Sequence, residues 1–170
     1  WRTVLQAEAT QKYVVCNADE GDSGTFSDRM TMEGDPYMLI EGMVIAGIAV
    51  GATKGVVYIR SEYPHAIAKM EAAIAASTHL VAPFVVEVRV GAGAYVCGEE
   101  SALIESLEGK RGTPRIRPPF PVIKGYLGRP TVVNNVETLA KTCLVALHGG
   151  ADFAATGTAQ SAGTKLISIS

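Results

Sequence analysis

The stretch FVVEVRVGAGAYVCGEE, residues 84–100, decides the fold, because a strand, a glycine-rich turn and the start of a helix follow one another directly. The apolar run at 84–90 predicts the strand, and residues 99–108 predict the helix. In α/β proteins a turn of this kind binds nucleotides, since free backbone N–H groups and the helix dipole favour phosphate. Here Glu99 and Glu100 stand where a pyrophosphate would bind, so the turn is suited to something other than a bare phosphate.

The same alternation of strands and helices extends to both sides of this stretch. Residues 12–16 and 55–60 predict two further strands, and residues 131–133 predict a brief fourth one. The order β-α-β-α-β-α predicts an α/β fold with a Rossmann-like, mainly parallel sheet flanked by helices. We expect this domain to span residues 1–155, with residues 156–170 opening a second domain through a strand at 164–170.

The low-charge segment 36–53 predicts a buried helix. Asp35 and Pro36 are typical of an N-cap and a first helical residue, and Gly51 is typical of a helix end. The segment approaches the roughly 18 residues that a membrane span needs. Close packing inside the protein is the better interpretation, because small residues are spaced to line one side of the helix, namely Gly42, Ala46 and Ala49. We therefore expect no direct membrane insertion.

Composition excludes several classes of function. The chain is 48% hydrophobic and 19% charged, which is typical of a folded globular protein. A net charge of −2 disfavours nucleic acid as a partner, since that needs a basic face. Three widely spaced cysteines, without a CxxC motif, predict neither a disulfide framework nor a metal site within this chain. A reducing, cytoplasmic location follows.

Three polar loops are expected at the carboxyl ends of the strands, where open α/β sheets bind ligands. In the first loop, Asn17, Asp19, Glu20 and Asp22 fall within six residues. Clustered carboxylates can bind a metal, ribose hydroxyls, or amide and ring N–H groups. Ordinary turn chemistry, in which Asn17 and Asp19 cap their own backbone, explains the local pattern slightly better, and metal binding explains it least well.

For the second and third loops, the sequence also allows two interpretations, a ligand site or a role at a helix terminus. Glycines and Tyr95 precede Glu99 and Glu100, so a ligand site is favoured over simple stabilisation by the helix dipole. The adjacent amides Asn134 and Asn135 could grip a ligand, but the N-cap of a helix, taken alone, is the better explanation.

Read together, four motifs resemble one family: CNADEGDSGTFSDRM at 16–30, GAGAYVCGEESALIESLEG at 91–109, PPFP at 118–121 and NNVETLA at 134–140. This is the NADH-binding FMN flavoprotein subunit shared by respiratory complex I, NAD-reducing hydrogenases and NAD-dependent formate dehydrogenases. Within it, GDSGTFSDRMTMEGDP and YIRSEYPHAIAKME most resemble the β subunit of formate dehydrogenase, with the flavoprotein subunit of complex I (NADH-quinone oxidoreductase) or of a hydrogenase as the alternative.

The resemblance implies hydride transfer between NAD(H) and FMN, followed by one-electron transfer to iron–sulfur clusters. It implies Glu100 beside the nicotinamide as the catalytic residue, Asp22 as a polar contact to NADH, and Phe120 stacked on adenine, although Phe120 could equally anchor its loop. Complex I members usually carry a glutamate where this chain has Asp22. The FMN contacts implied are Asn17, Asp19, Glu20, Tyr95, Gly98, Glu99, Asn134, Asn135 and Thr138.

The resemblance also implies parts outside the chain. Since Trp1 is not a start methionine, we expect an internal fragment, with the loop that holds the FMN phosphate before it. The [4Fe–4S] cysteines are expected after residue 170, and residues 156–170 are expected to begin a ubiquitin-like domain. The implied partners are a thioredoxin-like [2Fe–2S] subunit and a larger iron–sulfur or catalytic subunit. A complex I member would lie on the cytoplasmic side of the membrane.

Overall fold

A parallel four-stranded sheet forms the centre of the molecule. A computed structural model of the chain describes residues 1–169. The strands are β1 (Tyr13–Ala18), β2 (Lys54–Arg60), β3 (Val85–Gly91) and β4 (Thr131–Asn135), in the order β3-β2-β1-β4. In the parallel register, Asn17 at the end of β1 lies beside Asn135 at the end of β4. The predicted mainly parallel sheet is confirmed.

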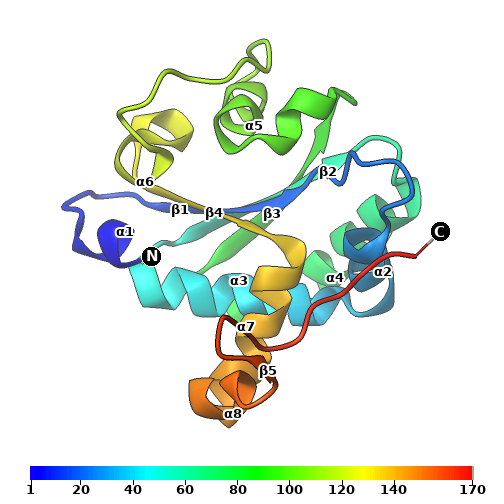
Figure 1. Cartoon of the computed structure of the whole chain (residues 1–170). Coiled ribbons are helices and arrows are strands. Elements are labelled where there is room, and N and C mark those ends of the chain that lie inside the picture. Colours follow the sequence, from blue (N-terminus) through cyan, green and yellow to red (C-terminus); the bar gives the residue numbers. More distant parts are fainter. Residues whose placement is uncertain (170) are drawn as a thin grey trace.

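Helices cover both faces of the sheet (Figure 1). One face packs against α1 (Arg2–Gln6), α2 (Ser27–Gly34), α3 (Pro36–Val50), α4 (Pro64–Val81) and α7 (Val136–His148). The other face carries α5 (Glu100–Leu107), followed by α6 (Pro121–Lys124). The 3₁₀ helices η1 (Tyr95–Gly98) and η2 (Tyr126–Gly128) flank these two, and α8 (Gly150–Ala154), β5 (Gly157–Thr158) and β6 (Ser161–Ala162) lie at the far end of α7.

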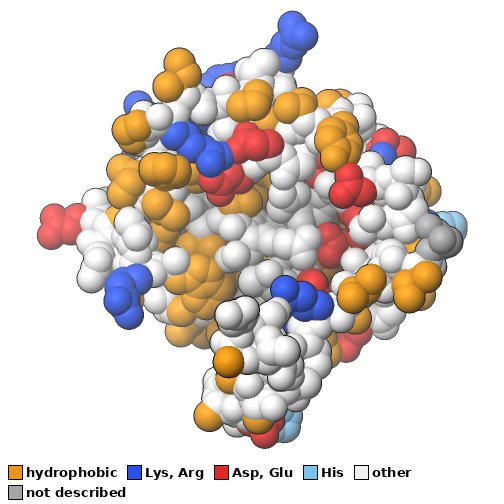
Figure 2. Space-filling model, in the orientation of Figure 1, with side chains coloured by type: hydrophobic (Ala, Val, Ile, Leu, Met, Phe, Trp, Pro, Cys, Tyr) orange, Lys and Arg blue, Asp and Glu red, His pale blue; other side chains and the backbone are white. Residues whose placement is uncertain are grey.

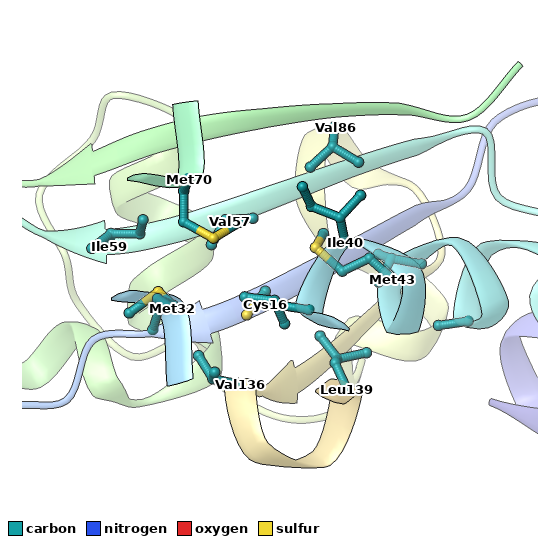
Figure 3. Close-up of a cluster of buried hydrophobic side chains, with 14 of the residues drawn as sticks. Cys16, Met32, Ile40, Met43, Val57, Ile59, Met70, Val86, Val136 and Leu139 are labelled. Atoms are coloured by element: carbon teal, nitrogen blue, oxygen red, sulfur yellow. The ribbon is translucent and has the colours of Figure 1, made fainter. Parts of the chain in front are cut away.

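The larger core lies between the sheet and α3, α4 and α7 (Figure 3). Met43 and Leu139 approach each other there from α3 and α7, and both are fully buried. The two helices come very close at Gly42, where an added Cβ would lie 1.9 Å from the carbonyl oxygen of Leu139. The expectation of close packing through Gly42 and Ala46 is therefore confirmed. Ala49 was wrongly included, because its side chain is exposed.

The predicted caps of α3 are confirmed. Asp35 accepts a hydrogen bond from the Met38 amide at 3.1 Å, Pro36 is the first helical residue, and Gly51 adopts a left-handed conformation at φ 75°. Pro36 and Gly51 bound a helix of 15 residues. Over residues 1–169, no helix combines the length and the apolar character that crossing a membrane requires.

The sequence leaves some elements unpredicted, and one predicted strand is wrong. It does not predict helix α2 before Asp35, and it predicts no element at 109–130, where α6 and η2 lie. Residues 164–169 carry no regular secondary structure, so the strand expected there is absent from that range. Ser170, its last residue, lies outside the described residues. The proposed domain boundary near residue 155 remains a prediction.

Candidate functional site

The three polar loops meet at one cleft beyond the carboxyl ends of β1 and β4. The cleft has a volume of about 730 Å³, in the range of small-molecule sites. It is lined by Asn17, Asp19, Glu20, Gly21, Asp22, Thr25, Ser27, Asp28, Tyr95, Val96, Gly98, Glu99, Pro114, Asn135 and Glu137. Eight residues predicted from the sequence are among them. The predicted residues Glu100, Phe120, Asn134 and Thr138 are not.

A direct hydrogen bond joins the first loop to the second. Asn17 donates from Nδ2 to the carbonyl oxygen of Gly98 at 2.9 Å, and its Oδ1 accepts from the Asp19 amide at 3.2 Å. The turn chemistry expected for Asn17 is therefore present. Because the side chain also reaches Gly98, it fixes the width of the cleft at this point.

Asp19 holds a buried acceptor without a partner. Its Oδ2 is inaccessible to solvent and makes no hydrogen bond to any described residue. Burial raises the pKa of Asp19; the positive charge of Arg60 opposes this rise and Glu62 adds to it. An unpaired buried oxygen at the edge of a cleft is costly unless a ligand supplies a donor.

The carboxylate of Glu20 is occupied by hydrogen bonds from the protein rather than left open to a ligand. Its carboxylate accepts hydrogen bonds from the amides of Asp28 and Arg29 at 2.9 and 3.2 Å, and from the hydroxyls of Ser27 and Tyr63 at 3.2 and 3.0 Å. Glu20 therefore caps α2 from the preceding loop. It lines the cleft, but its hydrogen-bonding capacity is largely taken.

Tyr95 spans the mouth of the cleft. Its hydroxyl donates to Oδ1 of Asp22 at 2.7 Å, although 70% of the residue is exposed. Its ring packs over Gly21, where an added Cβ would come within 2.8 Å of the ring. A second contact between the first and second loops thus depends on the absence of a side chain at Gly21.

Glu99 both caps α5 and faces the cleft. One carboxylate oxygen accepts from the amides of Ser101 and Ala102 at 3.0 and 2.9 Å, and the other pairs with Arg117. Burial alone would raise the pKa of Glu99, but the hydrogen bond from the Ser101 hydroxyl, those from the two amides and the charge of Arg117 lower it overall. Glu100 lies outside the cleft lining, with Oε1 at 3.1 Å from the same arginine.

Arg117 ties the proline-rich loop to the glycine turn. Besides pairing with Glu99 and Glu100, it lies 5.7 Å from the centre of the Phe120 ring, which is half exposed. Phe120 therefore lies beside the rim rather than inside the cleft. Sequence reasoning missed Arg117, although a basic residue directly before PPFP was a visible signal.

The third loop supplies Asn135 but not its neighbour. Asn135 caps α7 through Oδ1, which accepts from the Glu137 amide at 2.9 Å, and donates from Nδ2 to Asp28 at 2.6 Å. Asn134 instead accepts a hydrogen bond from the Trp1 ring nitrogen at 2.7 Å. Thr138 lines a separate cavity of about 480 Å³ near Trp1.

The cleft is strongly acidic. Figure 2 shows acidic side chains around the hollow in this face of the molecule. Among the described residues, the lining contains no lysine or arginine, but it contains six carboxylates, from Asp19, Glu20, Asp22, Asp28, Glu99 and Glu137. Such a lining repels phosphate and suits ligand groups that donate hydrogen bonds. Across residues 1–169, no group of three or more His, Cys, Asp or Glu side chains is arranged to hold a metal ion.

Comparison with known proteins gives the family. Residues 1–143 match the model of the Nuo51 FMN-binding domain, within the complex I 51 kDa family, and the chain belongs to this family. It is 49% identical to the NAD-reducing hydrogenase HoxS subunit alpha of Cupriavidus necator, over 99% of this chain and 30% of that protein. It is 47% identical to an NADH-quinone oxidoreductase subunit of Rhizobium meliloti, over 100% of this chain and 43% of that protein.

A solved structure agrees. A chain in the crystal structure of an NAD⁺-reducing [NiFe]-hydrogenase in the H₂-reduced state superposes with a TM-score of 0.91 and 48% identity. The match covers 96% of this chain and 29% of that one. The present chain thus spans between about 29% and 43% of the length of the relatives named here.

Proposed function

We propose that this member of the Nuo51 FMN-binding family is the cofactor-binding segment of an NADH:acceptor oxidoreductase, which holds FMN in the acidic cleft and admits NADH beside it. The observation that carries this proposal is the meeting of three polar loops on one cleft at the carboxyl edge of a parallel sheet. The family match, which covers residues 1–143, supports it.

The residues of the cleft fit the flavin better than they fit its phosphate. The unpartnered Oδ2 of Asp19 calls for a donor, and a flavin offers ring N–H and ribityl hydroxyl groups. The acidic lining disfavours a phosphate, so we place the FMN phosphate outside the cleft, on a glycine-rich loop beyond this chain.

FMN, when bound, supplies the ability to accept a hydride and to release electrons one at a time. The chain's own residues bind and orient it: Asn17 and Glu99 line the cleft, and Asp19 accepts from the ligand. Gly98 leaves room beside Asp19, while Tyr95 and Asp22 restrict access at the mouth. We assign Glu100 and Phe120, which Arg117 holds at the rim, to the nicotinamide and adenine ends of NADH.

Asp19→Asn in the full-length subunit tests the flavin site. The change places an amide group where the unpartnered carboxylate oxygen now lies, so it removes an acceptor without changing the shape. We expect FMN affinity to fall by about 10- to 100-fold, the range for a hydrogen bond to a charged group. Fluorescence titration of the flavin-free protein measures this. Glu87→Gln, at an exposed position on β3, is the control. Equal affinity in Asp19→Asn and wild type would contradict the assignment of Asp19.

Glu100→Gln tests the nicotinamide side. Because the Glu100 side chain is part-exposed and, among residues 1–169, forms an ion pair with Arg117 alone, the change should leave folding intact. We expect it to alter KM for NADH or the rate of ferricyanide reduction several-fold. Steady-state kinetics that matched wild type, with a normal flavin spectrum, would remove Glu100 from the site.

For the physiological complex, we propose the β subunit of a cytoplasmic NAD-dependent formate dehydrogenase, on the segments GDSGTFSDRMTMEGDP and YIRSEYPHAIAKME. The proposal includes a [4Fe–4S] cluster beyond this chain, a thioredoxin-like [2Fe–2S] subunit and a larger catalytic subunit. A hydrogenase subunit or a subunit of NADH-quinone oxidoreductase is the alternative, since relatives with those names match. Purifying the native complex and assaying NAD⁺ reduction with formate and with H₂, and NADH oxidation with quinone, distinguishes the three.

A further inference from the structure

Asp28 is a buried carboxyl in the wall of the cleft. It lies within the motif at 16–30 but is not among the site residues predicted from the sequence. It lies in the first turn of α2, and only 6% of the residue is exposed. The exposed remainder faces the cleft, since Asp28 is one of the lining residues. It is therefore placed to meet a ligand, although most of its surface is packed in the protein.

Asp28 is held by one short hydrogen bond. Asn135 donates from Nδ2 to its Oδ2 at 2.6 Å, while the Oδ1 of the same asparagine caps α7. Both polar ends of Asn135 are thus engaged, and its orientation is set by Asp28 on one side and by the helix on the other. The other carboxyl oxygen of Asp28, Oδ1, is left available to a ligand in the cleft.

Two glutamates face Asp28 across the cleft wall. Glu20 faces it from the loop after β1 and Glu137 from the start of α7, while the buried thiol of Cys16 lies beneath on β1. Arg29 follows on α2 itself, and Lys141 forms an ion pair with Glu137. Burial, with the two glutamates, raises the pKa of Asp28 to about 6, although the hydrogen bond from Asn135 opposes the rise.

We propose that Asp28 takes up a proton from solvent when a flavin ring occupies the cleft, and that its Oδ1 then donates a hydrogen bond to the ligand. This inference rests on the proposed function. A flavin ring carries carbonyl oxygens as well as an N–H group, and the charged side chains of the cleft offer acceptors only. A protonated carboxyl supplies a donor there, and the ligand removes the remaining water from it, which further favours the neutral form.

Riboflavin is the probe that tests this proposal. Riboflavin lacks the phosphate of FMN, which itself titrates near pH 6. Its affinity for the flavin-free, full-length subunit is measured by fluorescence from about pH 5 to about pH 9. Calorimetry near neutral pH, in two buffers of different ionisation enthalpy, counts the protons taken up.

The matched variants are Asp28→Asn and Glu33→Gln. The Asp28→Asn side chain keeps an acceptor for Asn135 but cannot change its charge, and Glu33 lies on the same helix outside the cleft lining. We expect the affinity of wild type and of Glu33→Gln to fall by up to about tenfold per pH unit above pH 6, with uptake of up to one proton. Asp28→Asn should show a much flatter profile and less proton uptake.

Each outcome supports or overturns the proposal. A pH dependence in Asp28→Asn equal to that of wild type, or a flat profile in wild type, would overturn the role of Asp28 and leave the flavin site intact. A wild-type subunit that bound neither riboflavin nor FMN at any pH would overturn the proposed function, and this inference with it.

Discussion

The ionised form of Asp28 destabilises the fold. Its pKa of about 6 lies above its ordinary value of 3.8, so the folded chain binds this proton more tightly than the unfolded chain does. Stability therefore falls as pH rises from about 4 to about 6, and the penalty is complete above that range.

Asp28→Asn should consequently raise stability at about pH 8, by about 1–3 kcal/mol, and change it little near pH 4. Urea denaturation of the unliganded chain at the two pH values measures the difference. Glu33→Gln is the control, since it makes the same chemical change elsewhere on α2. An Asp28→Asn variant less stable than wild type at pH 8 would show that the carboxylate is stabilising after all.

Sequence reasoning found the polar residues that follow the strand ends, and it missed Asp28 and Glu137, which lie in the first turns of α2 and α7. Asn17, Asp19 and Asp22 were predictable because a strand end followed by clustered polar residues is a local signal. Asp28 and Glu137 resemble ordinary acidic residues in the first turn of a helix. Their place in the cleft arises from the packing of α2 beside α7, which local pattern does not reveal.

At the level of elements, α2 shows why one helix escaped prediction. Its N-cap residue is Phe26, whose side chain cannot accept a hydrogen bond from the helix amides. The capping carboxylate comes instead from Glu20, which accepts from the amides of Asp28 and Arg29. In contrast, Asp35 and Asn135 cap the helices that they immediately precede, and those two helices were predicted. Capping signals thus predict a helix only when the cap is its direct neighbour.

Gly42→Ala tests the packing of α3 against α7. The new methyl group would meet the carbonyl oxygen of Leu139 at 1.9 Å, and a backbone atom cannot move aside without shifting the whole helix. We expect a loss of about 1–3 kcal/mol or more in the free energy of unfolding. Urea denaturation measures it.

Gly34→Ala is the matched control for Gly42→Ala. Gly34 is the last residue of α2, and an added Cβ there would meet no atom within 4 Å. Alanine should leave stability unchanged or raise it by up to about 1 kcal/mol, because it restricts the unfolded chain. Equal stability of the two variants would mean that α3 and α7 adjust freely.

For the whole molecule, the parallel sheet converts three distant segments into one site. The register places Asn17 beside Asn135, although the two residues are far apart in sequence. The alternation of strands and helices predicted this arrangement, because parallel strands end at the same edge. The sequence did not predict the net charge of the cleft lining. The chain carries 17 acidic and 15 basic residues, yet within the described part of the chain six acidic and no basic residues line the cleft.

This concentration of charge predicts how salt affects NADH. The dinucleotide is an anion and approaches an acidic cleft, so repulsion should weaken binding at low ionic strength. Exposed charges interact over about 30 Å at 0.01 M salt, but screening limits this range to about 8 Å at 0.15 M. KM for NADH in the full-length subunit should therefore fall several-fold over this range, while kcat changes little. Asp22→Asn, which removes an exposed carboxylate at the mouth, should reduce the salt effect, and Glu87→Gln, outside the lining, should not. If KM instead rose with salt, positive charge from the remainder of the protein would govern the approach of NADH.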